Sequence, residues 1–302
     1  MYSLDHRKGI ILAGGTGQRL KPLTSAISKQ LLPVYDKPMI YYPLSILMLS
    51  GIKDILIITT KKDQRIFKEL LGNGIDWGVT FNYAIQQKPE GIAQSLLIGE
   101  QFIDGNPVAI ALGDNLFHGT GLINLLEAAS QRKSGSTILA YPVRDPERYG
   151  VVIFDKDGKA LAIEEKPQEP TSQYAVTGLY FYDETAVERA KKLDFSDRGE
   201  LEISSLNQTY LNDGLLHVEL MGRGMAWLDT GTCDSLQDAS SYIRTLEHRQ
   251  GLKVGCPEEI AWRRKWINDK QLKNLVGPLM ASGYGAYLMK LLERSEVKKD
   301  IL

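Results

Sequence analysis

The chain contains little cysteine and little histidine. Cys233 and Cys256 are the only cysteines among 302 residues, and no Cys-x-x-Cys occurs. The four histidines form neither an HExxH pattern nor a zinc-finger spacing. We therefore expect no disulfide framework and no dedicated zinc site, and the reducing cytoplasm is the predicted compartment.

Long apolar runs and a surplus of charge are also missing. No run approaches the roughly 18 apolar residues of a membrane span, and the run at residues 10–13 is too short for a secretory signal. Lys and Arg number 36 against 37 Asp and Glu, so the net charge is −1. Because nucleic-acid and membrane-surface binders usually carry a basic surplus, we expect neither kind of partner. An anionic ligand would have to meet a local cluster of positive groups.

Two familiar glycine motifs are absent, although a glycine-rich loop is present. Residues 12–20 read Leu-Ala-Gly-Gly-Thr-Gly-Gln-Arg-Leu, which is neither the dinucleotide-binding GxGxxG nor a GxxxxGK[ST] phosphate loop. Glycines let backbone N–H groups approach a ligand closely, so this loop is a candidate phosphate cradle in which Arg19 supplies charge. The alternative is a plain tight turn between a strand and a helix.

The first half of the chain alternates strand and helix signals. Short apolar runs predict buried strands, and the longer segments between them predict helices. Such alternation favours right-handed crossovers and an α/β, doubly wound, mainly parallel Rossmann-like sheet. We expect strands at residues 9–13, 55–60, 79–85, 108–112 and 137–143, and helices at 41–49, 63–71, 92–102 and 122–132.

The pattern changes after residue 142. Closely spaced strands at 149–154, 160–164 and 175–182 predict a β-rich insert at about 142–182, and only helices are expected from residue 257 onward. The predicted domains are therefore residues 1–250, which include this insert, and a helical C-terminal appendage at 251–302. Between them we expect helices at 184–192, 202–212 and 235–248, and strands at 215–221 and 225–228.

Charged and polar residues follow several of these predicted strands. Asp114 and Asp229 each come directly after an apolar stretch, at the strand ends where open α/β sheets bind ligands. Two carboxylates from two strand ends suit Mg²⁺, which prefers a few protein oxygens plus phosphates and waters. Taken alone, either residue could instead be an ordinary loop aspartate.

Weaker signals lie elsewhere in the chain. Lys29 follows Gly17 closely enough to fold back over the same ligand, although a lone lysine is usually at the surface. Lys166 could bind a second anion beside Glu165, or the pair could simply be a charged strand end. Gln86, in a polar loop with Gly91, could read a nucleobase edge.

These motifs together resemble the sugar-1-phosphate nucleotidylyltransferases. The resemblance rests on the glycine loop, Lys29-Gln30-Leu31-Leu32-Pro33, Leu112-Gly113-Asp114 and Glu164-Glu165-Lys166-Pro167, and it extends from about residue 8 to 292. Longer strings, such as residues 27–42 and 221–232, resemble the branch that uses dTTP and glucose 1-phosphate. The resemblance implies dTDP-glucose and pyrophosphate as products, Mg²⁺ as cofactor, a role in dTDP-rhamnose supply for cell-surface polysaccharide, and a homotetramer built from dimers.

The resemblance also implies roles for individual residues. The catalytic residues would be Arg19, Lys166, Asp114 and Asp229, and the last two would hold Mg²⁺. The nucleotide-binding residues would be Gly14, Gly15, Thr16, Gly17, Arg19, Lys29, Gln30, Gln86, Gly91 and Asp114, and the sugar-phosphate side would be lined by Asn115, Gly150, Glu165, Lys166 and Val176.

Two alternatives remain at this point. A uridylyltransferase would differ in its preference for UTP over dTTP. A non-catalytic nucleotide-sugar sensor on the same fold should lack one of the aspartates or Lys166, yet all three are present.

The C-terminal appendage opens with a proline-started helix near Pro257. This helix has two interpretations: an ordinary amphipathic helix at a subunit interface, or part of a second, regulatory nucleotide site, as the resemblance implies for the family. In the second case arginine forks would meet a diphosphate. The candidate regulatory residues are Glu259, Ile260, Arg263 and Arg264.

Overall fold

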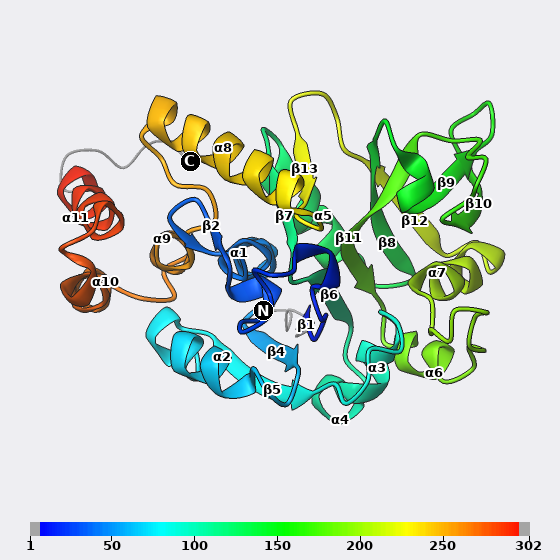
Figure 1. Cartoon of the computed structure of the whole chain (residues 1–302), viewed down its shortest axis with the longest axis horizontal. Helices are drawn as coiled ribbons and strands as arrows, with labels where there is room; N and C mark the ends of the chain where they lie inside the picture. Colours follow the sequence, from blue (N-terminus) through cyan, green and yellow to red (C-terminus); the bar gives the residue numbers. More distant parts are fainter. Residues whose placement is uncertain (1–6, 296–302) are drawn as a thin grey trace.

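The computed structural model describes residues 7–295, and the positions of its helices and strands follow the predicted alternation (Figure 1). The strands are β1 Lys8–Ala13, β2 Pro33–Val34, β3 Lys37–Pro38, β4 Asp54–Thr59, β5 Thr80–Ile85, β6 Val108–Leu112, β7 Asn115–His118, β8 Ser136–Pro142, β9 Gly150–Phe154, β10 Ala160–Glu165, β11 Tyr174–Tyr182, β12 Leu216–Leu220 and β13 Ala226–Asp229. The helices are α1 Tyr41–Leu49, α2 Gln64–Leu71, α3 Gln94–Ile98, α4 Glu100–Ile103, α5 Leu122–Gln131, α6 Ala186–Ala190, α7 Ile203–Asn212, α8 Cys233–Gln250, α9 Pro257–Arg263, α10 Asp269–Val276 and α11 Gly283–Ser295.

Within the described residues, the central sheet has nine strands. Its main path runs β10-β9-β11-β6-β1-β4-β5, and β8 pairs with β11 and carries β12 at its other edge. The pairs β6-β1, β1-β4 and β4-β5 are parallel, as predicted. β11 enters antiparallel beside β6, and through it the strands of the 142–182 segment continue the same sheet.

Each face of the sheet is covered by helices, which confirms the doubly wound prediction. Side chains alternate across the strands, so Ile11 and Ile57 join one apolar cluster, whereas Ile10 and Leu56 join another. The first cluster lies under α1, α5 and the C-terminal helices, and the second lies under α3, α6 and α7.

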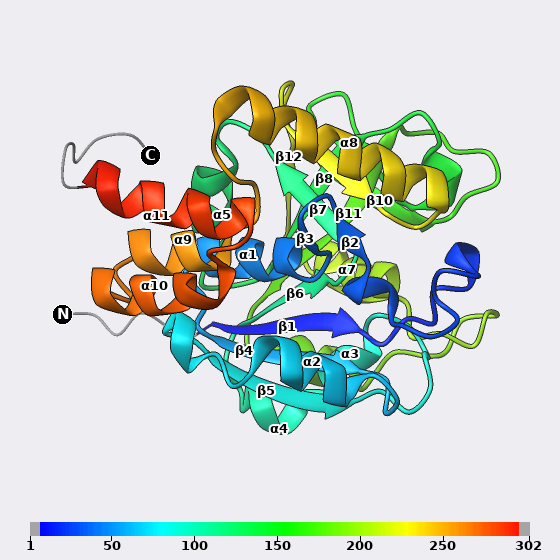
Figure 2. The same cartoon turned by 60° about the vertical axis from the view of Figure 1, so that its left-hand side comes forward.

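The C-terminal helices pack against the body of the molecule. Ile260 and Ala261 of α9, Leu272 of α10 and Leu288 of α11 belong to the same apolar cluster as α1. The three helices lie side by side at one end of the molecule (Figure 2), and β9, β10 and α7 lie at the other end in Figure 1. The helical appendage is thus present as predicted and shares a core with the preceding residues.

A few elements differ from the prediction. The helix expected at 92–102 is two short helices, α3 and α4, which are interrupted at Gly99. The two-strand sheet of β7 with β13 and the β2-β3 hairpin were not predicted in full, since β7, β2 and β3 have only two to four residues each. No helix in the described part of the chain is long and apolar enough to cross a membrane.

Candidate active site

The glycine loop after β1 is packed so closely that two of its positions have no room for a side chain. A Cβ on Gly14 would lie 2.3 Å from Oε1 of Gln86. Gly17 has a φ of 60°, and a Cβ there would lie 2.8 Å from Cγ2 of Thr24. Gly15 and Thr16 are exposed at the turn. The loop therefore brings its backbone to the surface beside the end of β1.

Lys29 and Gln30 are buried. The Lys29 ammonium forms an ion pair with the Asp114 carboxylate. Gln30 Oε1 accepts a hydrogen bond from Ser28 Oγ at 2.7 Å, and the Gln30 side chain packs where a Cβ on Gly113 would lie. Lys29 is therefore not a surface lysine, and its predicted contact with a ligand of the glycine loop stays a prediction.

Asp114 and Asp229 are brought together by the pairing of β7 with β13. In this antiparallel pair Asp229 lies opposite Asn115. Thr230 donates two hydrogen bonds to the Asp114 carbonyl, from its N at 3.3 Å and its Oγ1 at 2.8 Å. Burial and the nearby Asp114 carboxylate raise the pKa of Asp229. The two carboxylates predicted from separate strand ends thus form one acidic pair.

Positive groups surround this acidic pair. Arg148 Nη2 lies 3.4 Å from Asp229 Oδ2. Arg19 lies next to the same carboxylate, because a Cβ on Gly231 would be 2.9 Å from Arg19 Nη2 and 3.1 Å from Asp229 Oδ2. With Lys29 on Asp114, these side chains form the local cationic cluster that a near-neutral protein needs to bind a polyanion.

Tyr149 and Asn115 orient the acidic pair through hydrogen bonds. Tyr149 donates its hydroxyl to Asp229 Oδ2 at 3.5 Å, and burial together with Asp229 raises the pKa of Tyr149 to about 12. Asn115 donates from Nδ2 to Asp114 Oδ1 at 2.9 Å, and its own Oδ1 accepts from Trp227 Nε1 at 2.6 Å. Asn115 therefore acts on Asp114 as well as facing the pocket.

Gly150, Glu165 and Lys166 lie together on the other side of the pocket. Gly150 and Glu165 are register partners in the β9-β10 pair. Lys166 has a φ of 45°, which is uncommon for a residue with a side chain, and its N–H donates to the Tyr149 carbonyl at 3.0 Å. Residues held in such conformations cluster at functional sites. The Lys166 ammonium lies 3.6 Å from Glu165 Oε1 and is partly exposed.

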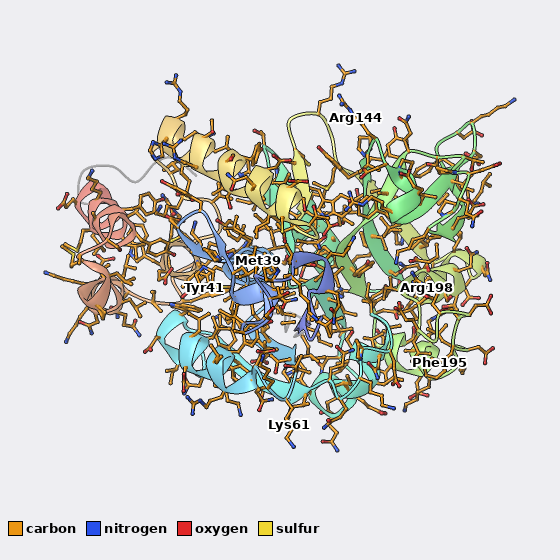
Figure 3. All side chains as sticks on the ribbon, viewed as in Figure 1. Met39, Tyr41, Lys61, Arg144, Phe195 and Arg198 are labelled. Carbon is orange, nitrogen blue, oxygen red and sulfur yellow. The ribbon has the colours of Figure 1, made fainter. Side chains whose placement is uncertain are left out.

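Arg198 joins this group from the segment that leads into α7 (Figure 3). Its Nη2 lies 3.3 Å from Glu165 Oε1 and 2.8 Å from Glu202 Oε1. Arg198 and Lys166 thus both contact the same oxygen of the Glu165 carboxylate.

A cavity of about 350 Å³ connects the two groups of residues. Val176 of β11 forms part of its wall. Eight predicted site residues line this cavity: Arg19, Asp114, Asn115, Gly150, Glu165, Lys166, Val176 and Asp229.

The other predicted nucleotide-binding residues lie outside the cavity lining. Gln86 packs against Gly14 and donates to Gln94 Oε1 at 2.7 Å. Gly91 has a φ of 101°, and a Cβ there would lie 2.3 Å from the Leu201 carbonyl. The residues outside the lining are Gly14, Gly15, Thr16, Gly17, Lys29, Gln30, Gln86 and Gly91.

Several lining residues were not predicted. Arg148 and Tyr149 directly precede Gly150, and Trp227 comes two residues before Asp229, so their sequence positions offered a signal. Apart from Val176, no motif marked the side chains that β11 and α7 contribute. These are Tyr180, Ile203, Ser204 and Asn207.

The residues proposed for regulation all lie in or next to α9, away from this cavity. Arg263 Nε donates to Glu259 Oε1 at 2.8 Å, and Tyr287 of α11 donates to Glu259 Oε2 at 2.5 Å. Arg264 donates to the Leu49 carbonyl and, at 2.9 Å, to Glu127 Oε1. Ile260 is buried. Arg264 thus fastens α9 to α1 and α5.

The chain belongs to the nucleotidyl transferase family, whose model matches residues 8–245. It is 56% identical over 294 residues to the glucose-1-phosphate thymidylyltransferase of Xanthomonas campestris, covering 97% of this chain and 100% of that protein. It is 58% identical over 287 residues to the enzyme of the same name from Mycolicibacterium smegmatis, covering 95% and 99%. At these identities over nearly the full length, the chain is a member of the glucose-1-phosphate thymidylyltransferases.

Solved structures agree with this placement. A Bacillus anthracis protein described as a glucose-1-phosphate thymidylyltransferase, in complex with a sucrose, superposes with a TM-score of 0.72 and is 44% identical. The match covers 79% of this chain and 95% of that one. A UDP-glucose pyrophosphorylase complexed with UDP-glucose superposes with a TM-score of 0.70 at 23% identity, covering 80% and 99%, which shows likeness of fold alone.

Proposed function

We propose that this protein transfers a thymidylyl group from dTTP to glucose 1-phosphate, which yields dTDP-glucose and pyrophosphate. The observation that carries the proposal is the convergence of two carboxylates and several cations on one cavity next to a glycine loop. The pairing of β7 with β13 brings Asp114 and Asp229 together, and Lys29, Arg19 and Arg148 surround them. A sugar-phosphate side with Lys166 adjoins them in the same cavity.

The proposed chemistry is a direct displacement at phosphorus. An oxygen of the sugar phosphate attacks the α-phosphorus of dTTP, the bond from that phosphorus to the bridging oxygen breaks, and pyrophosphate leaves. The second pKa of a phosphate ester is about 6, so the nucleophile is already largely dianionic at neutral pH. No general base is therefore required, and no histidine lines the cavity in the described part of the chain.

The main task of the side chains is to relieve repulsion between two polyanions. Arg19 lies on the side of the glycine loop, and Lys166 lies on the sugar-phosphate side. Preorganised positive charge at these two positions stabilises the transferring phosphoryl group as its charge spreads toward the leaving group.

The acidic pair fits a bound Mg²⁺. Among residues 7–295, no group of three or more His, Cys, Asp or Glu side chains gathers into a closed metal site. This agrees with Mg²⁺, which usually takes one or two carboxylates together with substrate phosphates and waters. Asp114 and Asp229 would hold the ion, which supplies positive charge next to the phosphates when it is bound.

The test is a matrix of nucleoside triphosphates against sugar 1-phosphates, with pyrophosphate release as the readout. We expect dTTP with glucose 1-phosphate to give the highest kcat/KM. A preference for UTP would make the chain a uridylyltransferase. No release with any pair, while nucleotide binding persists, would support a non-catalytic sensor.

Assembly, compartment and regulation belong to the same proposal. We infer a homotetramer built from dimers in the cytoplasm, and light scattering of the purified protein tests its mass.

We also infer that α9 forms part of a regulatory nucleotide site. Arg263→Ala should then weaken inhibition by dTDP-L-rhamnose while turnover of dTTP is largely kept. Unchanged inhibition that is purely competitive with dTTP would leave only a structural role for α9.

A further inference from the structure

One face of α7 forms part of the floor of the active-site cavity. Ile203, Ser204 and Asn207 all line it, and their spacing places them on one side of the helix. The same helix is tied to β10, since Gln208 Oε1 accepts a hydrogen bond from the Ile163 N–H at 3.2 Å. Because β10 also carries Glu165, this floor belongs to the sugar-phosphate half of the cavity.

Asn207, which lines this floor, carries a buried amide donor that is unpaired. The residue is 0% exposed, and its Oδ1 accepts a hydrogen bond from the Tyr182 hydroxyl at 2.7 Å. Its Nδ2 has no hydrogen-bond partner among the described residues. Native proteins rarely leave a buried donor unpaired, because the group loses its hydrogen bonds to water and gains none in return.

The charges of the cavity decide which end of a sugar phosphate reaches this donor. Arg19, Arg148 and Lys166 provide the positive charge for the phosphate end. Arg198, the fourth cation of the lining, is held by the carboxylates of Glu165, Glu200 and Glu202. The floor contributed by α7 carries no cation, since Ile203, Ser204 and Asn207 are neutral. The hydroxyl-bearing sugar ring therefore faces α7 when the phosphate is held by the cations.

We propose that Asn207 is a specificity-determining residue whose Nδ2 donates a hydrogen bond to a hydroxyl oxygen of the bound sugar. This inference rests on the proposed function, because it takes the sugar phosphate as the occupant of the cavity. Tyr182 is its positioning partner, since the hydroxyl of Tyr182 fixes the orientation of the amide. This hydrogen bond gives a partner to the Asn207 Nδ2 donor, which is unpaired in the free protein.

The experiment compares glucose 1-phosphate with its 2-, 3-, 4- and 6-deoxy analogues, using dTTP and measuring kcat/KM. In the wild-type protein, the analogue that lacks the contacted hydroxyl should lose about tenfold or more. In Asn207→Ala that penalty should fall at least about fivefold, while the penalties at the other positions stay unchanged. Asn212→Ala, an exposed asparagine on the same helix, should keep every wild-type penalty.

A second variant distinguishes loss of the proposed contact from loss of folding. Asn207→Leu combined with Tyr182→Phe removes both polar partners at once, so it leaves neither group unpaired in the core. It should stay folded and show the same loss of discrimination as Asn207→Ala. Unchanged penalties in both variants, or an equal loss for every analogue, would overturn the inference. If the wild-type protein does not use glucose 1-phosphate with dTTP, the proposed function fails instead.

Discussion

At the scale of single residues, the site combines two neighbouring carboxylates with cationic side chains that lie beside them. Asp229 is buried beside Asp114, and both the burial and the second carboxylate oppose its ionisation. Lys29, Arg148 and Arg19 offset this effect from different parts of the chain. The two carboxylates are therefore held beside side chains that balance their charge, which is the arrangement that the proposed Mg²⁺ site would use.

The acidic pair leads to the first prediction. Asp114→Asn and Asp229→Asn should each lower kcat by about 100-fold or more, because each removes charge next to the reacting phosphates. Circular dichroism should show that both variants remain folded. Asp238→Asn, an exposed aspartate on α8, is the matched control and should keep wild-type turnover. Near-normal turnover of either site variant at ordinary Mg²⁺ would exclude that residue as a metal ligand.

The positions of the two cations lead to the second prediction. Lys166→Ala should mainly raise the KM for glucose 1-phosphate, whereas Arg19→Ala should raise the KM for dTTP and lower kcat. Losing a hydrogen bond to a charged group typically costs about 1.5–3 kcal/mol, so we expect losses of about 10- to 100-fold in kcat/KM. Lys156→Ala, in the exposed turn between β9 and β10, is the control. Equal losses for both substrates in both variants would contradict this division of roles.

At the scale of elements, the sequence was most informative where a strand is buried on both faces. The runs at residues 9–13, 55–60 and 108–112 correspond to β1, β4 and β6 within a residue or two, because parallel strands covered on both sides are continuously apolar. Asp114 lies two residues beyond β6, as its motif predicted, whereas Asp229 is the last residue of β13 in a separate two-stranded sheet.

The rest could not be predicted because it depends on contacts between distant segments. β7 is four residues long, and only its partner β13 makes it a strand. Asn207 and Tyr180 reach the cavity because α7 and β11 pack beside it, and their local sequence resembles an ordinary core. Motifs mark groups that follow a strand directly, whereas the floor of a cavity is set by packing between elements.

The attachment of α9 leads to the third prediction. Arg264 bridges α9 to the Leu49 carbonyl at the end of α1 and to Glu127 of α5. Arg264→Ala should lower the free energy of unfolding by about 1 kcal/mol and Tm by about 2–4 °C. Turnover at saturating substrate should change little, since α9 lies away from the cavity. Arg244→Ala, an exposed arginine on α8, should leave Tm unchanged. Equal shifts in the two variants would contradict a specific role for this bridge.

At the scale of the whole molecule, the C-terminal helices meet the body around a second cavity. It measures about 530 Å³ and lies between the β2-β3 hairpin, the end of α8 and α11. Lys37 and Lys253 each pair with Asp36 and Glu247 in its wall. Each of these four charged side chains has partners of opposite charge within the cavity wall. The ion pairs therefore help to hold together the junction around this cavity.

Among the described residues, Glu258 is one of two buried carboxyl groups at this junction, and the other is Glu247. Glu258 lies on α9, and Tyr284 of α11 donates its hydroxyl to Glu258 Oε2 at 2.6 Å. Burial raises the pKa of Glu258, although its hydrogen bonds with Tyr284 and Cys256 and the charge of Lys37 act in the opposite direction. Because the pKa is higher in the folded protein, the folded state holds this proton over a pH range in which the unfolded chain has lost it.

The fourth prediction concerns pH and follows from the sign of that shift. The contribution of Glu258 to stability should be fully present below its unfolded pKa and should be lost as pH rises through its raised folded pKa. Glu258→Gln keeps an oxygen that can accept from Tyr284 but cannot titrate. The measurement is denaturant unfolding at several pH values from 4.5 to 9. As pH rises, the free energy of unfolding of the wild type should fall relative to that of the variant, by at most about 1.4 kcal/mol per pH unit. The difference should then level off. Glu293→Gln, an exposed residue on α11, should follow the wild-type curve throughout. A difference between the wild type and Glu258→Gln that is flat, or that grows in favour of the wild type as pH rises, would mean that Glu258 is ionised within the folded junction.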